Sequence, residues 1–306
     1  MGRRGKNDGP DGFLLIDKPS GWTSFDVVAR LRTLLGTRRI GHTGTLDPMA
    51  SGLMVVLVGR ATRLAPFVTD LGKAYLADIQ LGTTTNTYDA EGDVMSRASP
   101  EDLDVEALHA KVGALLPNFR GDIEQRPPAF SAIKVNGERA YAKARRGEGV
   151  VLPPRPVTVH RFDVVAKDGL RLVASVACSK GTYIRSLAHD LGTALGVGAH
   201  LAGLRRTAVG HFSVRDARTL ESISALEIPE RQGLLGTLAE AVAHLPTLLL
   251  DARQVVDVRH GKTIQVECAA AEMMRALDED GHLVALVAIS TTGDVVIRRG
   301  IPPPTT

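Results

Sequence analysis

The apolar residues of this 306-residue chain occur in short runs separated by glycine, proline and polar turns. The longest wholly apolar runs are Leu53–Val58 and Leu283–Ile289, of six and seven residues. Neither approaches the ~20 residues that a helix needs to cross a bilayer, so the sequence predicts no membrane span. Short runs of this kind are typical of buried strands in a soluble domain.

The order of the patterns predicts a mixed α/β fold with a largely antiparallel sheet flanked by helices. Strand-like runs at Phe13–Ile16, Leu53–Val58 and Tyr75–Leu81 are interleaved with a helical pattern at Ser24–Leu35. Strands and helices do not alternate strictly, as a parallel βαβ sheet would require. Further helices are expected at Pro100–Leu116, Gly181–Leu195, Ser222–Glu227 and Gln232–Ala243, and further strands at Val157–Val165, Leu170–Cys178 and Val209–Val214.

A change in composition at Pro246 predicts a large domain over residues 13–246 and a small, mostly β domain over residues 247–306. Residues 1–12, rich in Gly, Asp and Arg, are expected to be a disordered leader. Residues 121–155 are basic and hold few apolar anchors. A segment this long inside a domain is more often a functional flap than a filler loop.

Several classes of protein are excluded. The two cysteines, Cys178 and Cys268, are far apart and have no zinc-site spacing, so no metal is expected. The first residues carry charge but no apolar core, so we expect no signal peptide and a cytoplasmic protein. The Gly41–Gly52 segment lacks the Gly-Lys-Ser/Thr ending of a phosphate-binding loop, and no GxSxG hydrolase pattern occurs.

The net charge of +3 conceals an uneven distribution. Residues 1–63 hold 10 basic and 5 acidic side chains, and residues 120–161 hold 9 and 4. Residues 64–119, between them, hold 3 and 9. If the two basic blocks fold together, they form one positive face suited to a polyanion; the alternative is ordinary solvated charge.

One carboxylate stands out, because Asp47 lies between glycines and precedes Pro48, which favours a rigid, extended presentation. The plainer interpretation is a turn aspartate. His42 in the same loop is either a hydrogen-bonded structural residue or a ring for stacking on a base. Tyr75 suits an acid/base, a stacking platform or core filler. Arg185 opens a buried helix and needs an anionic partner, for which Asp47 is a candidate.

These residues lie in segments that resemble the bacterial tRNA pseudouridine-55 synthases, the TruB family, in their actinobacterial form. The resemblance spans residues 12–245, in the family's order. Its segments are Leu14–Val28, Gly41–Gly52, Lys73–Asp93, Gln125–Arg145, Cys178–Gly192 and Leu201–Phe212. Residues 247–306 resemble a small PUA-like RNA-binding domain. One departure is Asn86, where the family usually has aspartate.

The resemblance implies isomerisation of uridine 55 in the TΨC arm of tRNA, without cofactor or metal. It gives Asp47 as the nucleophile, Arg185 as its cationic partner and Tyr75 as the stacking residue and candidate base. Tyr183 and Leu204 match the other pocket positions. A carboxylate must be ionised to attack, and a nearby cation favours that form. Attack at C1′, attack at C6 and a glycal route all stay open.

The target base is stacked inside an RNA loop, so the enzyme must flip it out, and His42 matches the residue that fills the vacated space. The basic segment matches the family's thumb-like insertion, which closes on the RNA. Phosphate contacts are expected from Arg139, Lys143, Arg145 and Arg146. No repeat-bearing or coiled-coil interface is visible in the sequence, so we expect a monomer, and we expect no obligate protein partner.

Other classes of function stay open. The first is a non-catalytic RNA-binding or tRNA-folding protein with a synthase-like body, against which an intact set of Asp47, Tyr75 and Arg185 argues. The second is the same chemistry on ribosomal RNA or with a guide RNA. The third is a small-molecule enzyme that uses Asp47 as a hydrolytic nucleophile.

Overall fold

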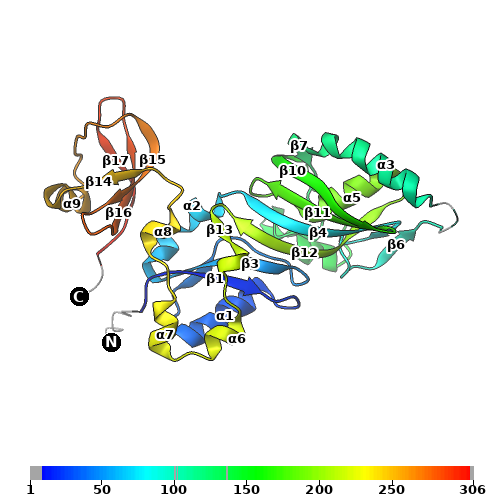
Figure 1. Cartoon of the computed structure of the whole chain (residues 1–306), viewed down its shortest axis with the longest axis horizontal. Helices are drawn as coiled ribbons and strands as arrows, with labels where there is room; N and C mark the ends of the chain where they lie inside the picture. Colours follow the sequence, from blue (N-terminus) through cyan, green and yellow to red (C-terminus); the bar gives the residue numbers. More distant parts are fainter. Residues whose placement is uncertain (1–8, 100, 102, 136, 304–306) are drawn as a thin grey trace. The chain divides into compact units, whose positions relative to one another are not determined.

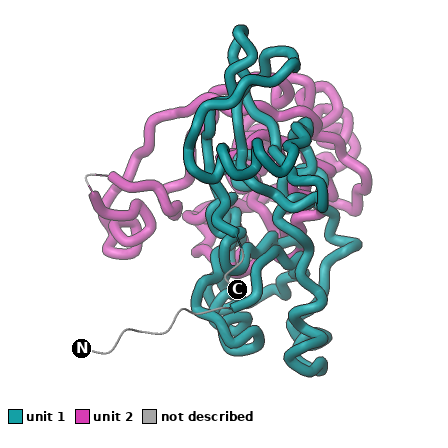
Figure 2. Tube along the Cα trace, turned by 90° about the vertical axis from the view of Figure 1, so that its left-hand side faces the viewer, with its two compact units in different colours: residues 1–47, 53–70, 210–306 teal, residues 48–52, 71–209 magenta. Residues whose placement is uncertain are grey.

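The computed structural model describes residues 9–99, 101, 103–135 and 137–303 (Figure 1). The chain divides into two compact units, coloured separately in Figure 2. Unit 1 comprises the residues up to 47, residues 53–70 and those from 210 onward. Unit 2 comprises residues 48–52 and 71–209. Most of the leader expected at residues 1–12 lies outside the described residues, but Asp11 forms an ion pair with Arg60.

Unit 1 begins with the predicted strand and helix. Strand β1 (Gly12–Lys18) leads to helix α1 (Ser24–Leu35), which starts at the cap Thr23 and ends at Gly36 in the left-handed conformation, φ 64°. Both ends follow from capping chemistry, because Thr23 and Asp26 form a reciprocal capping box. The elements that follow are β2 (Ile40–His42), β3 (Ser51–Val58), η1 (Gly59–Leu64) and α2 (Ala65–Thr69).

The later part of unit 1 is more broken than the sequence predicts. In place of two helices at Ser222–Glu227 and Gln232–Ala243, there are short helices α6 (Leu220–Ser224), α7 (Ile228–Gly233) and α8 (Leu238–Ala241). Thr219 and Thr237 each accept a backbone hydrogen bond, so each starts a new helix. Before them lie β13 (Phe212–Ser213) and η4 (Val214–Asp216).

The last part of unit 1 holds a four-stranded sheet in the order β14-β15-β16-β17. Its strands are β14 (Thr247–Leu249), β15 (Ala271–Leu277), β16 (Leu283–Ile289) and β17 (Val295–Gly300). Helix α9 (Ala252–Arg259) packs on it through Val255 and Val258 and was not predicted. Its capping box, Asp251 with Gln254, is the sequence signal that predicts it.

Unit 2 is built on five strands in the order β12-β4-β11-β10-β7, and all four pairings are antiparallel. This arrangement confirms the predicted mixed fold with a largely antiparallel sheet. The strands are β4 (Lys73–Leu81), β7 (Gly121–Gln125), β10 (Arg155–Asp168), β11 (Arg171–Cys178) and β12 (Ala199–Val209). Helices α3 (Val105–Leu115) and α5 (Ile184–Leu195) pack with these strands in one core (Figure 1).

Smaller elements complete unit 2. They are β5 (Thr83–Thr85), β6 (Val94–Arg97), η3 (Leu116–Phe119), β8 (Lys134–Val135), β9 (Glu138–Arg139) and α4 (Ala140–Arg145). The last three lie in the basic segment expected at residues 121–155, whose first five residues form β7 of the sheet. Of the cysteines, Cys178 is buried in β11, where burial raises its pKa to about 11, and Cys268 is exposed.

Two boundaries in unit 2 differ from the prediction. Helix α3 begins at Val105 rather than at Pro100, because Asp104 rather than Ser99 caps it, accepting from the Ala107 N–H at 3.0 Å. The strand expected at Val209–Val214 is not continuous: β12 ends at Val209, β13 spans only Phe212–Ser213, and Val214 begins η4. None of the described helices is long and apolar enough to cross a membrane.

Candidate active site

In the segment Gly41–Gly52, called here the Asp47 loop, backbone groups form hydrogen bonds with side chains and with the backbone of β3. The Ser24 hydroxyl donates to the Leu46 carbonyl at 3.1 Å and accepts from the Leu46 N–H at 2.9 Å. The Thr43 N–H donates to the Val55 carbonyl at 3.1 Å. His42 Nδ1 accepts from the Gly44 N–H at 3.3 Å. These contacts fix the part of the loop that precedes Asp47, and Asp47 itself is partly buried.

The loop ends at a glycine that no other residue can replace without strain. Gly52 has φ 100°, and a Cβ there would lie 2.3 Å from the Arg206 carbonyl oxygen. Gly52 pairs with Arg206 of β12 in parallel register. The backbone of β3 therefore meets β12 at a distance that only glycine permits.

Arg206 is a functional candidate that sequence analysis missed. It is 2% exposed and lies opposite Tyr75 in the β12–β4 pairing. Burial lowers the pKa of Arg206, and a hydrogen bond between its guanidinium and the Tyr75 side chain opposes that shift. A buried guanidinium is costly unless it is hydrogen-bonded, so Arg206 orients the phenol of Tyr75.

Two of the predicted pocket residues of unit 2, Tyr75 and Leu204, share one core. Tyr75 and Leu204 are partly buried against the cluster formed by β4, β11, β12 and α5, and Met49 packs on the same cluster. Tyr183 is the residue that precedes α5. Its N–H donates to Gln125 Oε1 at 2.8 Å, and its carbonyl accepts from Gln125 Nε2 at 3.0 Å. Gln125 therefore holds the start of α5 to the end of β7.

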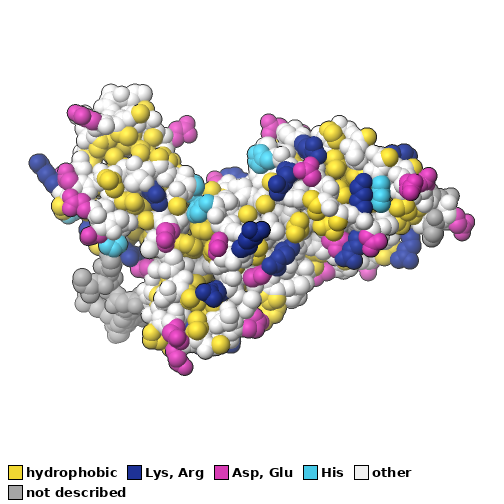
Figure 3. Space-filling view, in the orientation of Figure 1, with side chains coloured by type: hydrophobic (Ala, Val, Ile, Leu, Met, Phe, Trp, Pro, Cys, Tyr) yellow, Lys and Arg dark blue, Asp and Glu magenta, His cyan; other side chains and the backbone are white. Residues whose placement is uncertain are grey.

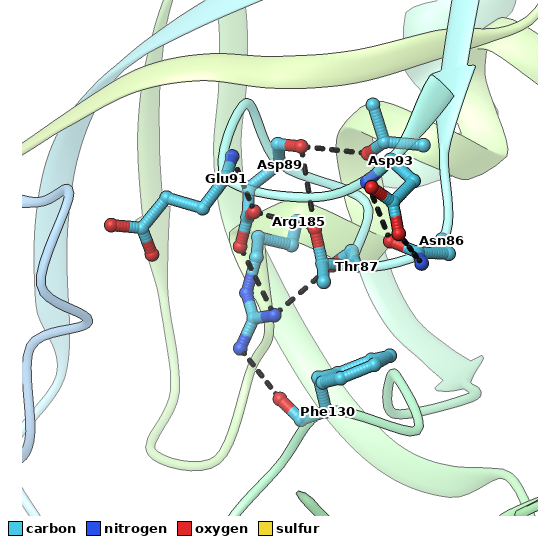
Figure 4. Close-up of polar contacts among 8 residues, drawn as sticks. Asn86, Thr87, Asp89, Glu91, Asp93, Phe130 and Arg185 are labelled. Atoms are coloured by element: carbon cyan, nitrogen blue, oxygen red, sulfur yellow. Dashed lines mark hydrogen bonds and ion pairs between the residues drawn. The ribbon is translucent and has the colours of Figure 1, made fainter. Parts of the chain in front are cut away.

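Arg185 lies in the first turn of α5 and is buried. Its Nη1 lies 3.2 Å from Asp89 Oδ2 and donates to the Thr87 carbonyl at 3.0 Å. Its Nη2 donates to the Phe130 carbonyl at 3.0 Å (Figure 4). The predicted need for an anionic partner is met by Asp89, which is 96 residues away in sequence. The pairing with Asp47 stays a prediction.

Asp89 belongs to the turn at Thr85–Asp93, called here the Asp89 loop. The carbonyl of Asp89 accepts from Thr85 Oγ1 at 2.7 Å, and its Oδ1 accepts from Thr87 Oγ1 at 2.6 Å and from the Glu91 N–H at 3.1 Å. One oxygen of the carboxylate thus organises the loop, and the other faces Arg185 (Figure 4). An ionised carboxylate accepts both kinds of contact well.

The departure at Asn86 has a local role in this structure. Asn86 Nδ2 donates to Asp93 Oδ2 at 3.1 Å, and its Oδ1 accepts from the Asp93 N–H at 3.0 Å. An aspartate at position 86 would place two carboxylates side by side. The amide instead supplies one donor and one acceptor, so it closes the base of the Asp89 loop.

The four basic residues of the expected insertion lie in a short helix and its flanks, but they differ in exposure and in partners. Arg146 forms ion pairs with Glu138 at 2.5 Å and with Glu148 at 2.7 Å, and Lys143 lies 3.9 Å from Glu148. The guanidinium of Arg145 lies over the Tyr141 ring at 5.6 Å. Arg139 is exposed at the start of α4.

The surface of unit 2 carries both basic and acidic side chains. On the face shown in Figure 3, basic side chains of unit 2 are interspersed with carboxylates rather than gathered in one patch.

A group of possible metal-ligand atoms within 4.8 Å of one another occurs at Asp278, Asp280 and His282, two of them exposed. Exposed groups on a turn form such clusters without an ion, so this group supports no metal assignment.

Comparison with known families matches most of the chain. The TruB family pseudouridylate synthase N-terminal domain matches residues 32–184. The tRNA pseudouridylate synthase B C-terminal domain matches residues 185–249, and the tRNA pseudouridine synthase II C-terminal domain matches residues 245–293.

Among solved structures, a Cbf5–Nop10–Gar1 complex contains a similar chain, with a TM-score of 0.71 at 28% identity. The match covers 96% of this chain and 85% of that one. A chain in an H/ACA ribonucleoprotein bound to a substrate RNA containing 2′-deoxyuridine gives a TM-score of 0.70 at 25% identity, covering 98% and 92%.

Named relatives are closer in sequence. The tRNA pseudouridine synthase B of Arthrobacter sp. strain FB24 is 46% identical over 291 residues, covering 90% of this chain and 92% of its own. That of Thermobifida fusca is 49% identical over 263 residues, covering 83% and 86%. The folds agree, and these identities extend over nearly whole chains. The chain therefore belongs to the TruB family of pseudouridylate synthases.

Proposed function

We propose that this pseudouridine synthase acts on tRNA and isomerises uridine 55 of the T-arm, with Asp47 as the nucleophile. The observation that carries the proposal is the Asp47 loop, which resembles the family's catalytic segment throughout its length. Hydrogen bonds from Ser24 and Thr43 hold it, and Pro48 follows Asp47 directly. A carboxylate on such a loop is held in place before the substrate arrives, which lowers the entropic cost of attack.

The reaction breaks the N1–C1′ bond, forms a C5–C1′ bond, removes the proton from C5 and adds one to the released N1. Reactant and product are isomers, so neither oxidant nor reductant is consumed. Asp47 supplies the carboxylate that starts the exchange. Tyr75 stacks on the uracil and, as the phenolate, accepts the C5 proton, while the hydrogen bond from the Arg206 guanidinium orients that oxygen. Arg185, held by Asp89 and two carbonyls, supplies a fixed positive charge.

The remaining residues are proposed to act on the RNA. His42 fills the space that the flipped base leaves, and Tyr183 and Leu204 line the uracil pocket. The catalytic domain spans residues 13–246, and its thumb-like insertion spans residues 121–155. Phosphates of the RNA are contacted by four basic residues of this insertion, Arg139, Lys143, Arg145 and Arg146. Residues 247–306 add a PUA-like RNA-binding domain. The enzyme works as a monomer without a cofactor.

The test uses an unmodified tRNA transcript, purified protein and no added cofactor, with pseudouridine mapped by chemical labelling. A single product at position 55 that disappears with Asp47→Asn is expected, while transcript binding is retained. Tyr75→Phe should retain binding and lose about 100-fold or more in rate. Product at another position refutes the substrate assignment. Tight binding with no product favours the non-catalytic alternative.

The phosphate contacts have a separate test. Arg145→Ala should weaken tRNA binding and reduce the slope of log K against log salt by about one unit. The control is Arg171→Ala, because Arg171 is exposed on β11 and bonds Asp78. An unchanged slope for Arg145→Ala removes that residue from the interface.

A further inference from the structure

Among the described residues, Tyr88 is the non-glycine residue with a positive φ, at 65°. A bulky side chain in this left-handed region costs about 1–2 kcal/mol, so its surroundings must hold it there. Its N–H donates to the Thr85 carbonyl at 3.3 Å, and its carbonyl accepts from the Leu201 N–H of β12 at 3.0 Å. The backbone on both sides of the strained residue is therefore tied down.

The ring of Tyr88 supplies the other restraint. It stacks on His189 of α5, with ring centroids 3.8 Å apart and planes 8° from parallel. Burial raises the pKa of Tyr88 and lowers the pKa of His189, so both rings are neutral near pH 7. His189 Nδ1 is buried and makes no hydrogen bond within the part of the chain that the structure describes. The stack on Tyr88, rather than a hydrogen bond of Nδ1, therefore orients the His189 ring.

The two contacts of the loop fall on one face of α5. Arg185 and His189 are four residues apart, so their side chains are neighbours on the helix surface. Tyr88 and Asp89 are adjacent in the Asp89 loop. Tyr88 contacts His189. Asp89 Oδ2 lies 3.2 Å from Arg185 Nη1, and Figure 4 shows these two side chains facing each other. Consecutive loop residues thus engage consecutive turns of the helix.

We propose that Tyr88 and His189 are positioning residues, whose stack holds the Asp89 loop so that Asp89 and the Thr87 carbonyl meet Arg185. Without the ring, only the backbone hydrogen bonds to Thr85 and Leu201 oppose the cost of positive φ at residue 88. A change to negative φ there redirects the chain at the next residue, which is Asp89. The stack thus acts on catalysis only through Arg185, and in this respect the inference rests on the proposed function.

Variants at position 88 separate the stack from the strain. Tyr88→Gly removes the ring and frees the backbone, because glycine adopts either sign of φ, whereas Tyr88→Phe keeps the ring. With the tRNA transcript, Tyr88→Gly and His189→Ala should slow single-turnover pseudouridine formation by about 10-fold or more, with Kd changed less than about twofold. Tyr88→Phe should restore at least about half of the rate. His160→Ala, at an exposed histidine of β10, is the matched control.

A double-mutant cycle tests the route through Asp89. Adding Tyr88→Gly to Asp89→Asn should slow the reaction no further than Asp89→Asn alone, since both act through the same ion pair. Full activity of Tyr88→Gly, or additive losses in the double variant, overturns the inference and leaves the proposed function intact.

A spectroscopic measurement is independent of the substrate. The ¹⁵Nε resonance of Arg185 should shift and broaden in Tyr88→Gly and stay in place in Tyr88→Phe. An Arg185 resonance that is unchanged in Tyr88→Gly refutes the positioning role. If the wild type forms no pseudouridine in tRNA, the proposed function fails, and this measurement still decides the inference.

Discussion

The Asp47 loop and the Asp89 loop are both polar and irregular, yet different interactions hold them. The backbone of the Asp47 loop forms hydrogen bonds with the Ser24 side chain and with Val55. The Asp89 loop adds to its backbone hydrogen bonds an ion pair with Arg185 and a ring stack on His189. The hydrogen-bond anchor of the Asp47 loop, Ser24, lies 22 positions from Leu46, whereas Arg185 and His189 lie about 100 positions from the Asp89 loop. The Asp89 loop should therefore respond to changes in a helix that is remote in sequence.

The largest effect is expected where the Asp47 loop meets β12. Gly52→Ala places a Cβ 2.3 Å from the Arg206 carbonyl oxygen and forces alanine to φ 100°. We expect a loss of about 4 kcal/mol or more in the free energy of unfolding, measured by urea denaturation. Gly41→Ala in the same loop is the control, because nothing lies within 4 Å of its Cβ position. Equal stability of the two variants would show that the backbone packing is not tight.

The Asp89 loop should be most sensitive at its ion pair. Asp89→Asn leaves the buried Arg185 with a neutral partner, and both side chains are less than 8% exposed. The expected loss in unfolding free energy is about 3 kcal/mol. Asp163→Asn, which breaks the exposed pair with Arg120, should cost less than about 1 kcal/mol. Similar losses at both positions would mean that burial of the Arg185 pair has no energetic weight.

The side-chain anchor of the Asp47 loop gives a smaller effect. Ser24→Ala removes the acceptor of the Leu46 N–H and the donor to its carbonyl in a buried setting. We expect a loss of about 2 kcal/mol, read from the shift of the urea midpoint. Ser222→Ala, at an exposed serine of α6, should change stability by less than about 0.5 kcal/mol. If Ser24→Ala is equally mild, water or neighbouring groups replace the anchor.

The smallest effect concerns pH and the helix beside the Asp89 loop. Burial raises the pKa of Asp190 to about 6, with a partial offset from Arg126. The folded state therefore binds this proton more tightly than the unfolded state. The resulting stabilisation is complete below pH 3.8 and is lost as the pH rises through 6.

Asp190→Asn should accordingly raise the free energy of unfolding at pH 8 and leave it unchanged at pH 3.5. The first pH is about two units above the pKa in the folded protein, and the second is just below the ordinary pKa of 3.8. The gain is at most about 1 kcal/mol, because the carboxyl is only partly buried. Thermal unfolding at both pH values measures it. A gain that is the same at both pH values would assign the effect to packing rather than to charge.

The contrast between the loops also explains what the sequence could predict. Capping residues such as Thr23 and Gly36 act within one helical turn, so the ends of α1 were predicted correctly. The glycines and Pro48 of the Asp47 loop are equally local. Strand β12 was missed because Gly203 and two arginines break its alternation, and the structure places register irregularities beside them.

The partner of Arg185 could not be predicted, because Asp89 lies far from it in the sequence. Its residue type shows that a buried guanidinium needs an anion, but not which carboxylate lies beside it in the fold. The Tyr88–His189 stack left no sequence signal, because neither residue type is unusual in a loop or a helix. The hydrogen bond of Arg206 to Tyr75 depends on the register of β12 with β4, which only the folded sheet defines.

The placement of the two cysteines gives each unit its own chemical reporter. Cys268 in unit 1 is exposed, so a maleimide should reach it in the native protein. Cys178 lies inside the sheet of unit 2 with a raised pKa, so it should react only when β11 separates from its neighbours. The second labelling step therefore runs at the rate at which unit 2 opens. Mass spectrometry of the wild-type protein during maleimide labelling can time that opening without an introduced cysteine.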